Sequence, residues 1–279
     1  MKRFYISVDM EGITGTVSWQ EYEKDFLRLR KIITEEVNAL LKGIEKGLAS
    51  KDFEVLICDA HASGLNILFE ELPENVLLAR GGIGDLGMMT GIDNTFSAAF
   101  FLGYHSEIGE EKALMDHTYA SATIYEIKIN GQKVSEAIIN AAIAGYFNVP
   151  LIFVSGDDKL IENIKRNLPT GIETVITKFG LSRFSAITKT LKRTLKEIEE
   201  KASLAVKKIE NIKVYKIEGP INLEIALNET IQADIISLLP NVKRVSGRLI
   251  TTQTDNIIDA QRLIRLIAIL GRACREFFR

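Results

Sequence analysis

The chain has 279 residues, of which 46% are hydrophobic and 26% are charged, a composition typical of globular proteins with a sizeable core. Its 35 basic and 37 acidic residues give a net charge of −2, which argues against nucleic acid as the partner because a phosphate backbone attracts basic surfaces. No uncharged apolar stretch approaches the ~20 residues of a membrane-spanning helix, and an acidic pair interrupts the first apolar run before it could serve as a signal peptide, so we expect a cytoplasmic protein.

Short apolar runs alternate with helical patterns through the first half of the chain. Residues 4–8 predict a buried strand, and residues 22–48 predict a helix whose apolar positions recur on one face. Further strands are expected at residues 54–59, 76–79, 98–103, 124–129 and 151–154. The pair Asn130-Gly131 predicts a type I′ turn before a helix over residues 134–146, and Asp157-Asp158 is expected to cap another helix. This alternation indicates an α/β fold with a mostly parallel sheet flanked by helices.

Beyond about residue 180 the pattern changes. A long charged amphipathic helix over residues 188–209 precedes a strand-like run at 221–226, a short helix near 230–238 and a last helix over 255–277. We therefore expect residues 1–180 to form the larger domain and residues 181–279 a smaller C-terminal α/β lobe. Cys58 falls in a predicted strand and Cys274 in a predicted helix, which indicates buried thiols in a reducing compartment rather than a disulfide framework.

Polar side chains follow the carboxyl ends of the predicted strands, where ligands collect in an α/β sheet. They are Asp9 and Glu11 after the first strand, Asp59 and His61 after the second, His105 after the run at 98–103, and His117 in the loop that follows. Alternation along the first strand would place its two acids on one side, where they repel each other unless a cation lies between them. Carboxylates together with imidazoles favour zinc, manganese or iron over calcium or magnesium.

Each of these residues taken alone has a simpler explanation. A surface Asp-x-Glu is usually solvated, and a histidine at a strand end more often satisfies a loop carbonyl than binds a metal. The helix dipole explains an acid in a first helical turn, such as Glu136, and Asp59 could orient His61 or a loop amide. The metal hypothesis is favoured because one rule, applied to successive strands, brings nearly every histidine of the chain beside the paired acids.

The segment Gly82-Ile83-Gly84-Asp85-Leu86-Gly87 matches the G-x-G-x-x-G fingerprint of dinucleotide-binding proteins. Its context argues against that function, because Gly91 interrupts any helix after it and the motif follows a third strand rather than the first. We interpret the segment as a flexible turn near the active site and keep nucleotide binding as the less favoured alternative. No G-x-S-x-G elbow occurs, and neither cysteine lies in the context of a nucleophile, which disfavours a serine or cysteine triad.

The segment Ser7-Val8-Asp9-Met10-Glu11-Gly12 resembles the S-x-D-x-E-G signature of the D-aminopeptidase family of zinc peptidases. Further segments are similar to that family in the same order: Cys58–His61, Gly91–Phe96, Phe101–His105, Val134–Glu136, Ala144–Tyr146 and Val154–Asp158. The similarity runs through most of residues 1–160 and is diffuse beyond them. The sequence departs from the family at Asp116, where the family has a small polar residue; this acid either raises the pKa of His117 or points away from it.

The resemblance implies two zinc ions per chain in the first domain, with Asp9 as the bridge and His117 as the catalytic residue. The implied ligands are Asp9, Glu11, His61, His105 and Glu136. Two cations that share a carboxylate lower the pKa of a bound water from ~15.7 toward ~7, which suits hydrolysis near neutral pH. The pattern leaves open whether His117 acts as a nucleophile or as an acid or base.

The implied activity is that of a metallo-aminopeptidase, a hydrolase that removes the N-terminal residue of short peptides or amides, with D-amino acids as the expected substrates. An L-peptidase or an amidohydrolase with the same metals stays an alternative, since fold and ligands do not fix chirality. A binding protein that keeps metal for stability is another. The family forms ring-shaped decamers, so we expect a homo-oligomer that admits short peptides.

Overall fold

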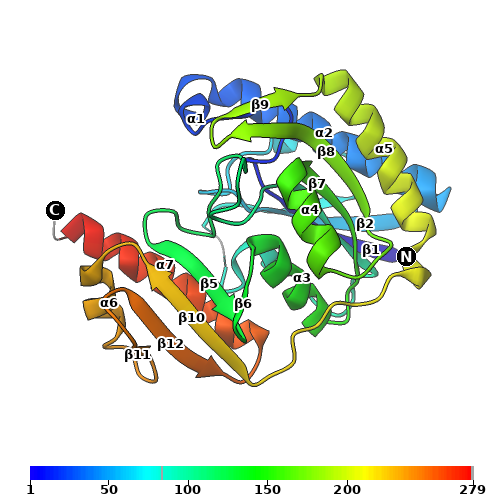
Figure 1. Cartoon of the computed structure of the whole chain (residues 1–279). Coiled ribbons are helices and arrows are strands. Elements are labelled where there is room, and N and C mark those ends of the chain that lie inside the picture. Colours follow the sequence, from blue (N-terminus) through cyan, green and yellow to red (C-terminus); the bar gives the residue numbers. More distant parts are fainter. Residues whose placement is uncertain (83, 278–279) are drawn as a thin grey trace.

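The computed structural model describes residues 1–82 and 84–277 and contains two sheets. The larger sheet has the strand order β3-β2-β1-β4-β7-β8-β9 (Figure 1). Its strands are β1 (Lys2–Val8), β2 (Phe53–Asp59), β3 (Val76–Ala79), β4 (Ala98–Tyr104), β7 (Leu151–Asp157), β8 (Glu173–Ser182) and β9 (Ser185–Thr188). All neighbours in it are parallel except β8 and β9. The α/β fold with a mostly parallel sheet is thereby confirmed.

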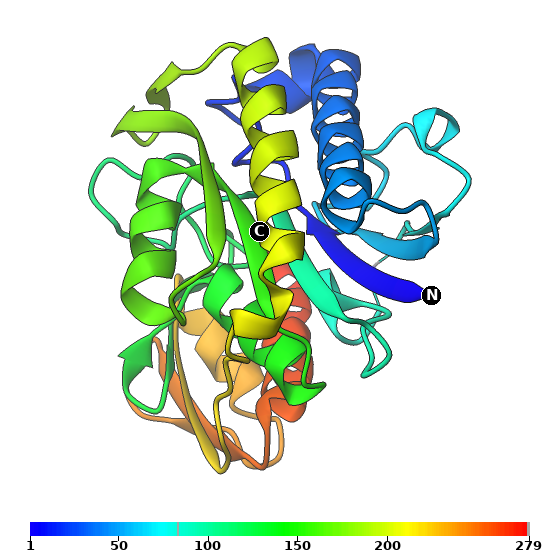
Figure 2. The same ribbon diagram turned by 90° about the vertical axis from the view of Figure 1, so that its right-hand side faces the viewer.

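Helices cover both faces of this sheet. On one face α2 (Phe26–Leu48) and α5 (Leu191–Lys207) lie side by side (Figure 2), and on the other lie α3 (Glu136–Tyr146) and α4 (Asp158–Asn167). The alternation of β1 decides which side chains enter which core: Phe4 and Ile6 pack toward α2, and Tyr5 packs into the opposite core. The expected helix over 22–48 is divided, because Asp25 leaves the helical conformation between α1 (Gln20–Lys24) and α2.

The smaller sheet is antiparallel, with the order β11-β12-β10-β5-β6. Its strands are β5 (Ile124–Ile129), β6 (Gln132–Lys133), β10 (Ile221–Leu227), β11 (Lys243–Arg244) and β12 (Leu249–Thr254). Asn130 and Gly131 join β5 to β6 with φ of 51° and 78°, as the predicted type I′ turn requires. Two helices, α6 (Thr230–Ile236) and α7 (Ile257–Phe277), pack on this sheet.

Strand pairing crosses the expected lobe boundary in both directions. Residue 180 lies inside β8, a strand of the larger sheet, and the hairpin β5–β6 pairs with β10 from far along the chain. Short 3₁₀ helices complete the fold: η1 (Phe69–Glu71), η2 (Gly87–Met89) and η3 (Ile209–Asn211). Within residues 1–82 and 84–277, every helix is too short or too polar to cross a bilayer.

The order of the larger sheet places a topological switch point between β1 and β4. The chain moves outward from β1 to β2 and β3 and then returns to the other side of β1, the arrangement in which α/β proteins bind ligands beyond the carboxyl strand ends. The loop after β1 and the end of β4 touch there through their backbones. A Cβ atom on Gly12 would lie 1.8 Å from the carbonyl oxygen of Tyr104, and one on Gly103 would lie 2.2 Å from that of Asp9. Glycine is therefore required at both positions.

Candidate metal centre and active site

The paired acids lie in a turn beyond β1 rather than on the strand. Because β1 ends at Val8, Asp9 and Glu11 do not share a strand face, and the turn brings their carboxylates together instead. Both side chains are buried, with exposed fractions of 3% and 2%. The indole Nε1 of Trp19 donates a hydrogen bond of 3.0 Å to Oε1 of Glu11, which leaves Oε2 directed at the centre.

His61 approaches both acids from the end of β2. Its Nδ1 lies 3.2 Å from Oδ1 of Asp9 and 3.0 Å from Oε2 of Glu11. The imidazole stacks on the ring of Tyr22, with 4.9 Å between the ring centroids. This stacking fixes the orientation of the imidazole plane. Asp59 does not contact these atoms. It accepts hydrogen bonds from the backbone amides of Asn66 and Ile67, which is the predicted role of orienting loop amides.

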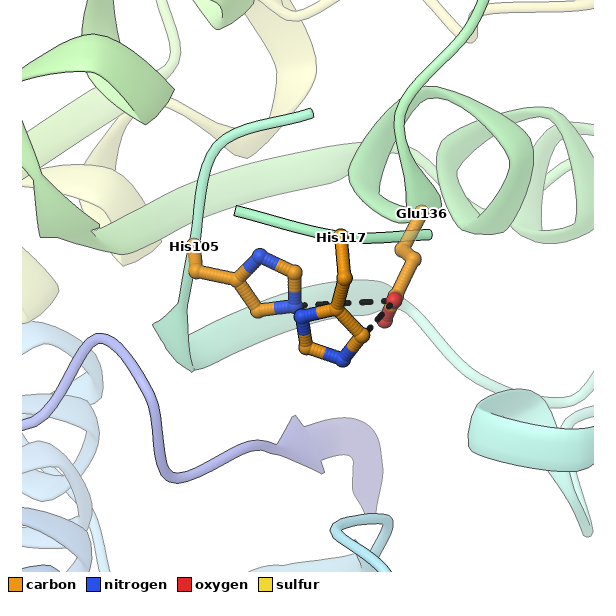
Figure 3. A group of neighbouring side chains, drawn as sticks. All are labelled: His105, His117 and Glu136. Atoms are coloured by element: carbon orange, nitrogen blue, oxygen red, sulfur yellow. Dashed lines mark ion pairs between the residues drawn. The ribbon is translucent and has the colours of Figure 1, made fainter. Parts of the chain in front are cut away.

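His105, His117 and Glu136 form the other side of the centre (Figure 3). Nδ1 of His105 donates to the carbonyl of Ser106, so its Nε2 faces Oδ2 of Asp9 at 3.6 Å and Oε1 of Glu136 at 3.5 Å. The two imidazoles stack with centroids 4.2 Å apart, and Nε2 of His117 lies 3.8 Å from the same glutamate oxygen. Glu136 is the first residue of α3, which Ser135 caps.

The carboxylate of Asp9 faces two groups at once. Oδ1 is directed at His61, and Oδ2 at His105. Three buried atoms here have no hydrogen-bond partner among the described residues: Oδ2 of Asp9, Oε2 of Glu11 and Nε2 of His105. Buried polar atoms are almost always satisfied. Their convergence, and a donor set of carboxylates and imidazoles, fits a metal ion such as zinc.

Ligand atoms within 4.8 Å of one another define two candidate metal groups. One is Asp9, Glu11 and His105, and the other is His105, His117 and Glu136. His117 therefore lies close enough to belong to a metal shell, although the sequence predicts a catalytic role for it. The six predicted site residues are all brought together, and their individual roles remain predictions.

Burial and close spacing shift the pKa values of the groups in this centre. Burial and the adjacent Glu11 raise the pKa of Asp9 to about 7. Burial opposes the charged form of His61, but Glu11 and Asp9 outweigh it and raise the pKa of His61 to about 10. Burial and the neighbouring His105 lower the pKa of His117. The buried carboxylates thus favour positive charge between them, which a bound cation would supply.

Asp116 points away from the centre. Its Oδ2 accepts a hydrogen bond of 2.6 Å from the backbone amide of Gly109, and its Oδ1 pairs with Nε of Arg183 at 2.9 Å. The second of the two expectations for this acid is therefore correct. The guanidinium of Arg183 lies over the ring of Trp19, so Asp116 helps to hold the indole that contacts Glu11.

Lys178 supports the centre and was not predicted from the sequence. Its side chain is completely buried on β8, and its Nζ donates to the carbonyl oxygens of Glu11, Ile13 and Thr16. The loop after β1 is thus tied to β8. Residues 173–179 show no regular apolar alternation, so the sequence does not predict the strand that carries this lysine.

A cavity of about 450 Å³ opens onto the centre. Five of the six predicted site residues line it, and His105 lies behind them. The glycine-rich segment 82–87 contributes to its surroundings: Gly87 begins the three-residue η2, whose Met88 lines the cavity. No α-helix follows this segment before β4, so the helix of a dinucleotide site is missing from the described residues. Ile83, in the middle of the motif, lies outside them.

Comparisons with known proteins agree with this geometry. A family model described as D-aminopeptidase matches residues 1–266. A D-aminopeptidase of Bacillus subtilis (strain 168) is 28% identical over 273 residues, covering 96% of this chain and 97% of that protein. The structure of DppA from Bacillus subtilis, described as a Zn-dependent D-aminopeptidase and a self-compartmentalizing protease, superposes with a TM-score of 0.90. It is 27% identical, and the match covers 97% of this chain and 98% of that one.

Proposed function

The chain belongs to the D-aminopeptidase family and is a metallo-aminopeptidase, and from this we propose that it uses two zinc ions to remove the N-terminal D-amino acid from short peptides or amides. The observation that carries the proposal is the orientation of Asp9. Its two oxygens are directed at different histidines, as a carboxylate that bridges two ions requires. The Zn-dependence of DppA supports zinc as the metal.

The proposed ligands divide between two metal positions. Glu11 and His61, 3.0 Å apart, would hold one ion, His105 and Glu136, 3.5 Å apart, would hold the other, and Asp9 would contact both. Bound zinc would supply a Lewis acid for the scissile carbonyl and a water of lowered pKa. Neighbouring groups orient three of these ligands. Trp19 donates a hydrogen bond to Glu11, Tyr22 stacks on His61, and the carbonyl of Ser106 accepts a hydrogen bond from His105.

His117 is the proposed catalytic residue. Its Nδ1 donates to the carbonyl of Met115, so the basic nitrogen is Nε2, which faces the cavity side of Glu136. Burial and His105 lower the pKa of His117, so the imidazole is neutral at pH 7 and can accept a proton at Nε2. Glu136 lies within 3.8 Å and stabilises the imidazolium that results.

Two further properties belong to the proposal. Assembly into a closed homo-oligomer, with a decameric ring as the expected form, is supported by the self-compartmentalizing description of DppA. A cytoplasmic location is supported by two buried free cysteines, which suit a reducing compartment. Analytical ultracentrifugation tests the first property, and a mass that does not correspond to about ten chains would contradict it.

The function is tested by elemental analysis and paired amide substrates. Protein purified without chelator is expected to hold about two zinc ions per chain and to hydrolyse D-alanine amide, with activity lost on chelation and restored by zinc. The amide of L-alanine, assayed in parallel, distinguishes an L-peptidase on the same centre. Protein that contains no transition metal and yet hydrolyses the amide would refute the metal mechanism.

A further inference from the structure

His117 lies between two residues whose backbone is in the left-handed region. Met115 has a φ of 45° and Tyr119 a φ of 58°, values that are uncommon for residues with large side chains. A residue stays in this conformation only where contacts with the surrounding structure hold it there. The segment 115–119 must therefore be held by its neighbours on both sides of the histidine.

Before His117, the segment is held by the turn between β8 and β9. The backbone amide of Met115 donates a hydrogen bond of 2.8 Å to the carbonyl of Arg183. Nη2 of Arg183 donates one of 3.0 Å to the carbonyl of Asp116. The side chain of Arg183 has an exposed fraction of 47%, so this side of the segment is held at the protein surface.

After His117, the segment is held by α3 at two points. The backbone amide of Tyr119 donates to Oε1 of Glu136 at 2.5 Å, and the hydroxyl of Tyr119 donates to Oδ1 of Asn140 at 3.1 Å. Glu136 and Asn140 are four residues apart in α3, so they lie on the same face of the helix. Tyr119 therefore lies along one turn of α3, with its backbone at a proposed metal ligand and its hydroxyl at an amide.

The amide of Asn140 is oriented by a network of buried hydrogen bonds. Oγ of Ser7 lies 2.8 Å from the carbonyl oxygen of Met88, which can only accept, so the serine donates to it. The serine oxygen then accepts from the hydroxyl of Tyr104, 2.6 Å away. Because Tyr104 has used its only hydrogen, it accepts from Nδ2 of Asn140 at 3.0 Å. The network thus leaves Oδ1 of Asn140 as the acceptor that faces Tyr119.

This network ends two residues away from the proposed catalytic histidine. Ser7, Tyr104 and Asn140 are completely buried, so they form a rigid support for the hydroxyl of Tyr119. On the basis of the proposed function, we propose that Tyr119 is a positioning residue for His117. Its bond to Asn140 holds the segment against α3 and keeps Nε2 of His117 beside Glu136. The serine of S-x-D-x-E-G takes part as the far end of the network.

The test removes the hydroxyl of Tyr119 and leaves its ring. With D-alanine amide as substrate, Tyr119→Phe should lower kcat by about 10- to 100-fold, because a displacement of about 1 Å at a reacting group can cost about 100-fold in rate. KM should stay within about twofold of wild type. Zinc per chain should be unchanged, since none of the proposed ligands is altered.

Tyr5→Phe is the matched control, because it removes a hydroxyl from another completely buried tyrosine. The hydroxyl of Tyr5 donates to the carbonyl of Thr90 at 3.0 Å, and Tyr5 does not line the cavity. The bond from Ser7 to Met88 does not depend on this hydroxyl. The kcat of Tyr5→Phe should therefore stay within about twofold of wild type.

A double-mutant cycle tests whether Tyr119 acts through Asn140. Asn140→Leu removes the acceptor and nearly keeps the volume of the side chain, and it should lower kcat at least as much as Tyr119→Phe. Adding Tyr119→Phe to Asn140→Leu should change kcat by less than about twofold, because both variants lose the same hydrogen bond. Losses that multiply in the double variant would overturn the proposal.

Hydrogen exchange measures the position of the segment without any substrate. In zinc-loaded protein, amide exchange of residues 115–119, followed by mass spectrometry, should be faster in Tyr119→Phe than in wild type and Tyr5→Phe. Equal exchange in all three proteins, or a kcat of Tyr119→Phe within twofold of wild type, would also overturn the proposal. If Tyr119→Phe does not fold, Asn140→Leu decides by the same two measurements. If wild type does not cleave the amide, the proposed function fails, and exchange alone decides whether Tyr119 holds the segment.

Discussion

Replacing His105 and His117 one at a time separates metal binding from chemistry. The two rings are stacked neighbours, yet their basic nitrogens have different surroundings. Nε2 of His105 is buried between Asp9 and Glu136, and its loss leaves one metal position with carboxylates only. Loss of a partner that merely orients a ligand costs about 10- to 100-fold in metal affinity, so His105→Ala should reduce zinc affinity by at least about 100-fold at that position. Activity should fall with zinc content.

His117→Ala should keep its zinc and lose turnover. A positioned acid or base contributes about 10²- to 10⁴-fold to the rate, and kcat should fall by that factor. The side chain lies at the cavity with 13% exposure, so its removal enlarges the cavity without opening the core. The assay is zinc per chain beside kcat on D-alanine amide, with circular dichroism as the control for folding. A fully active His117→Ala, or one that loses zinc while His105→Ala retains it, would reverse the two roles.

Three further results are expected. Burial raises the pKa of Glu36 to about 7 from 4.5, so the folded state holds a proton that the unfolded state releases, and the free energy of unfolding should fall by on the order of 3 kcal/mol as pH rises from about 4.5 to 7. In urea titrations at several pH values the fall should be smaller by that amount in Glu36→Gln; an equal fall in the variant and in wild type would exclude a contribution from Glu36. Lys178→Met leaves three buried carbonyls without their donor and should lower the free energy of unfolding by about 3 kcal/mol, measured in the same way. A change below about 1 kcal/mol would mean that water replaces the amine. Calorimetry with NAD should detect no binding, and saturable micromolar affinity would restore the dinucleotide interpretation of the segment 82–87.

The strand-end rule succeeded because β1, β2 and β4 are adjacent in the sheet. Neighbouring parallel strands have their carboxyl ends at the same edge of the sheet, independent of the conformation of the loops. Asp9, His61 and His105 could therefore be predicted to lie close together from the strands alone. The reason given for pairing Asp9 with Glu11 was nevertheless wrong, since a turn and not the strand pleat brings them together.

Other features depended on contacts between distant segments. The hairpin β8–β9 lies at the sheet edge and mixes polar and apolar residues. Its sequence therefore shows neither the two-residue period of a strand nor the 3.6-residue period of a helix clearly enough to predict it. The pairing of β5 with β10 joins segments about 100 residues apart, and no local pattern encodes such a partner. Lys178 depends on that missed hairpin, because only a strand beside β7 brings its amine to the loop after β1.

The contact between Gly12 and Gly103 bears on how the family signature should be interpreted. The glycine that ends S-x-D-x-E-G is required by packing, because the loop after β1 lies so close to the end of β4 that no side chain fits between them. The glycines that the fold requires can therefore be conserved in evolution even where the acids of the centre are not. A descendant that has exchanged Asp9 and Glu11 for neutral residues while keeping both glycines would still align with this family, yet it would have lost its catalytic chemistry.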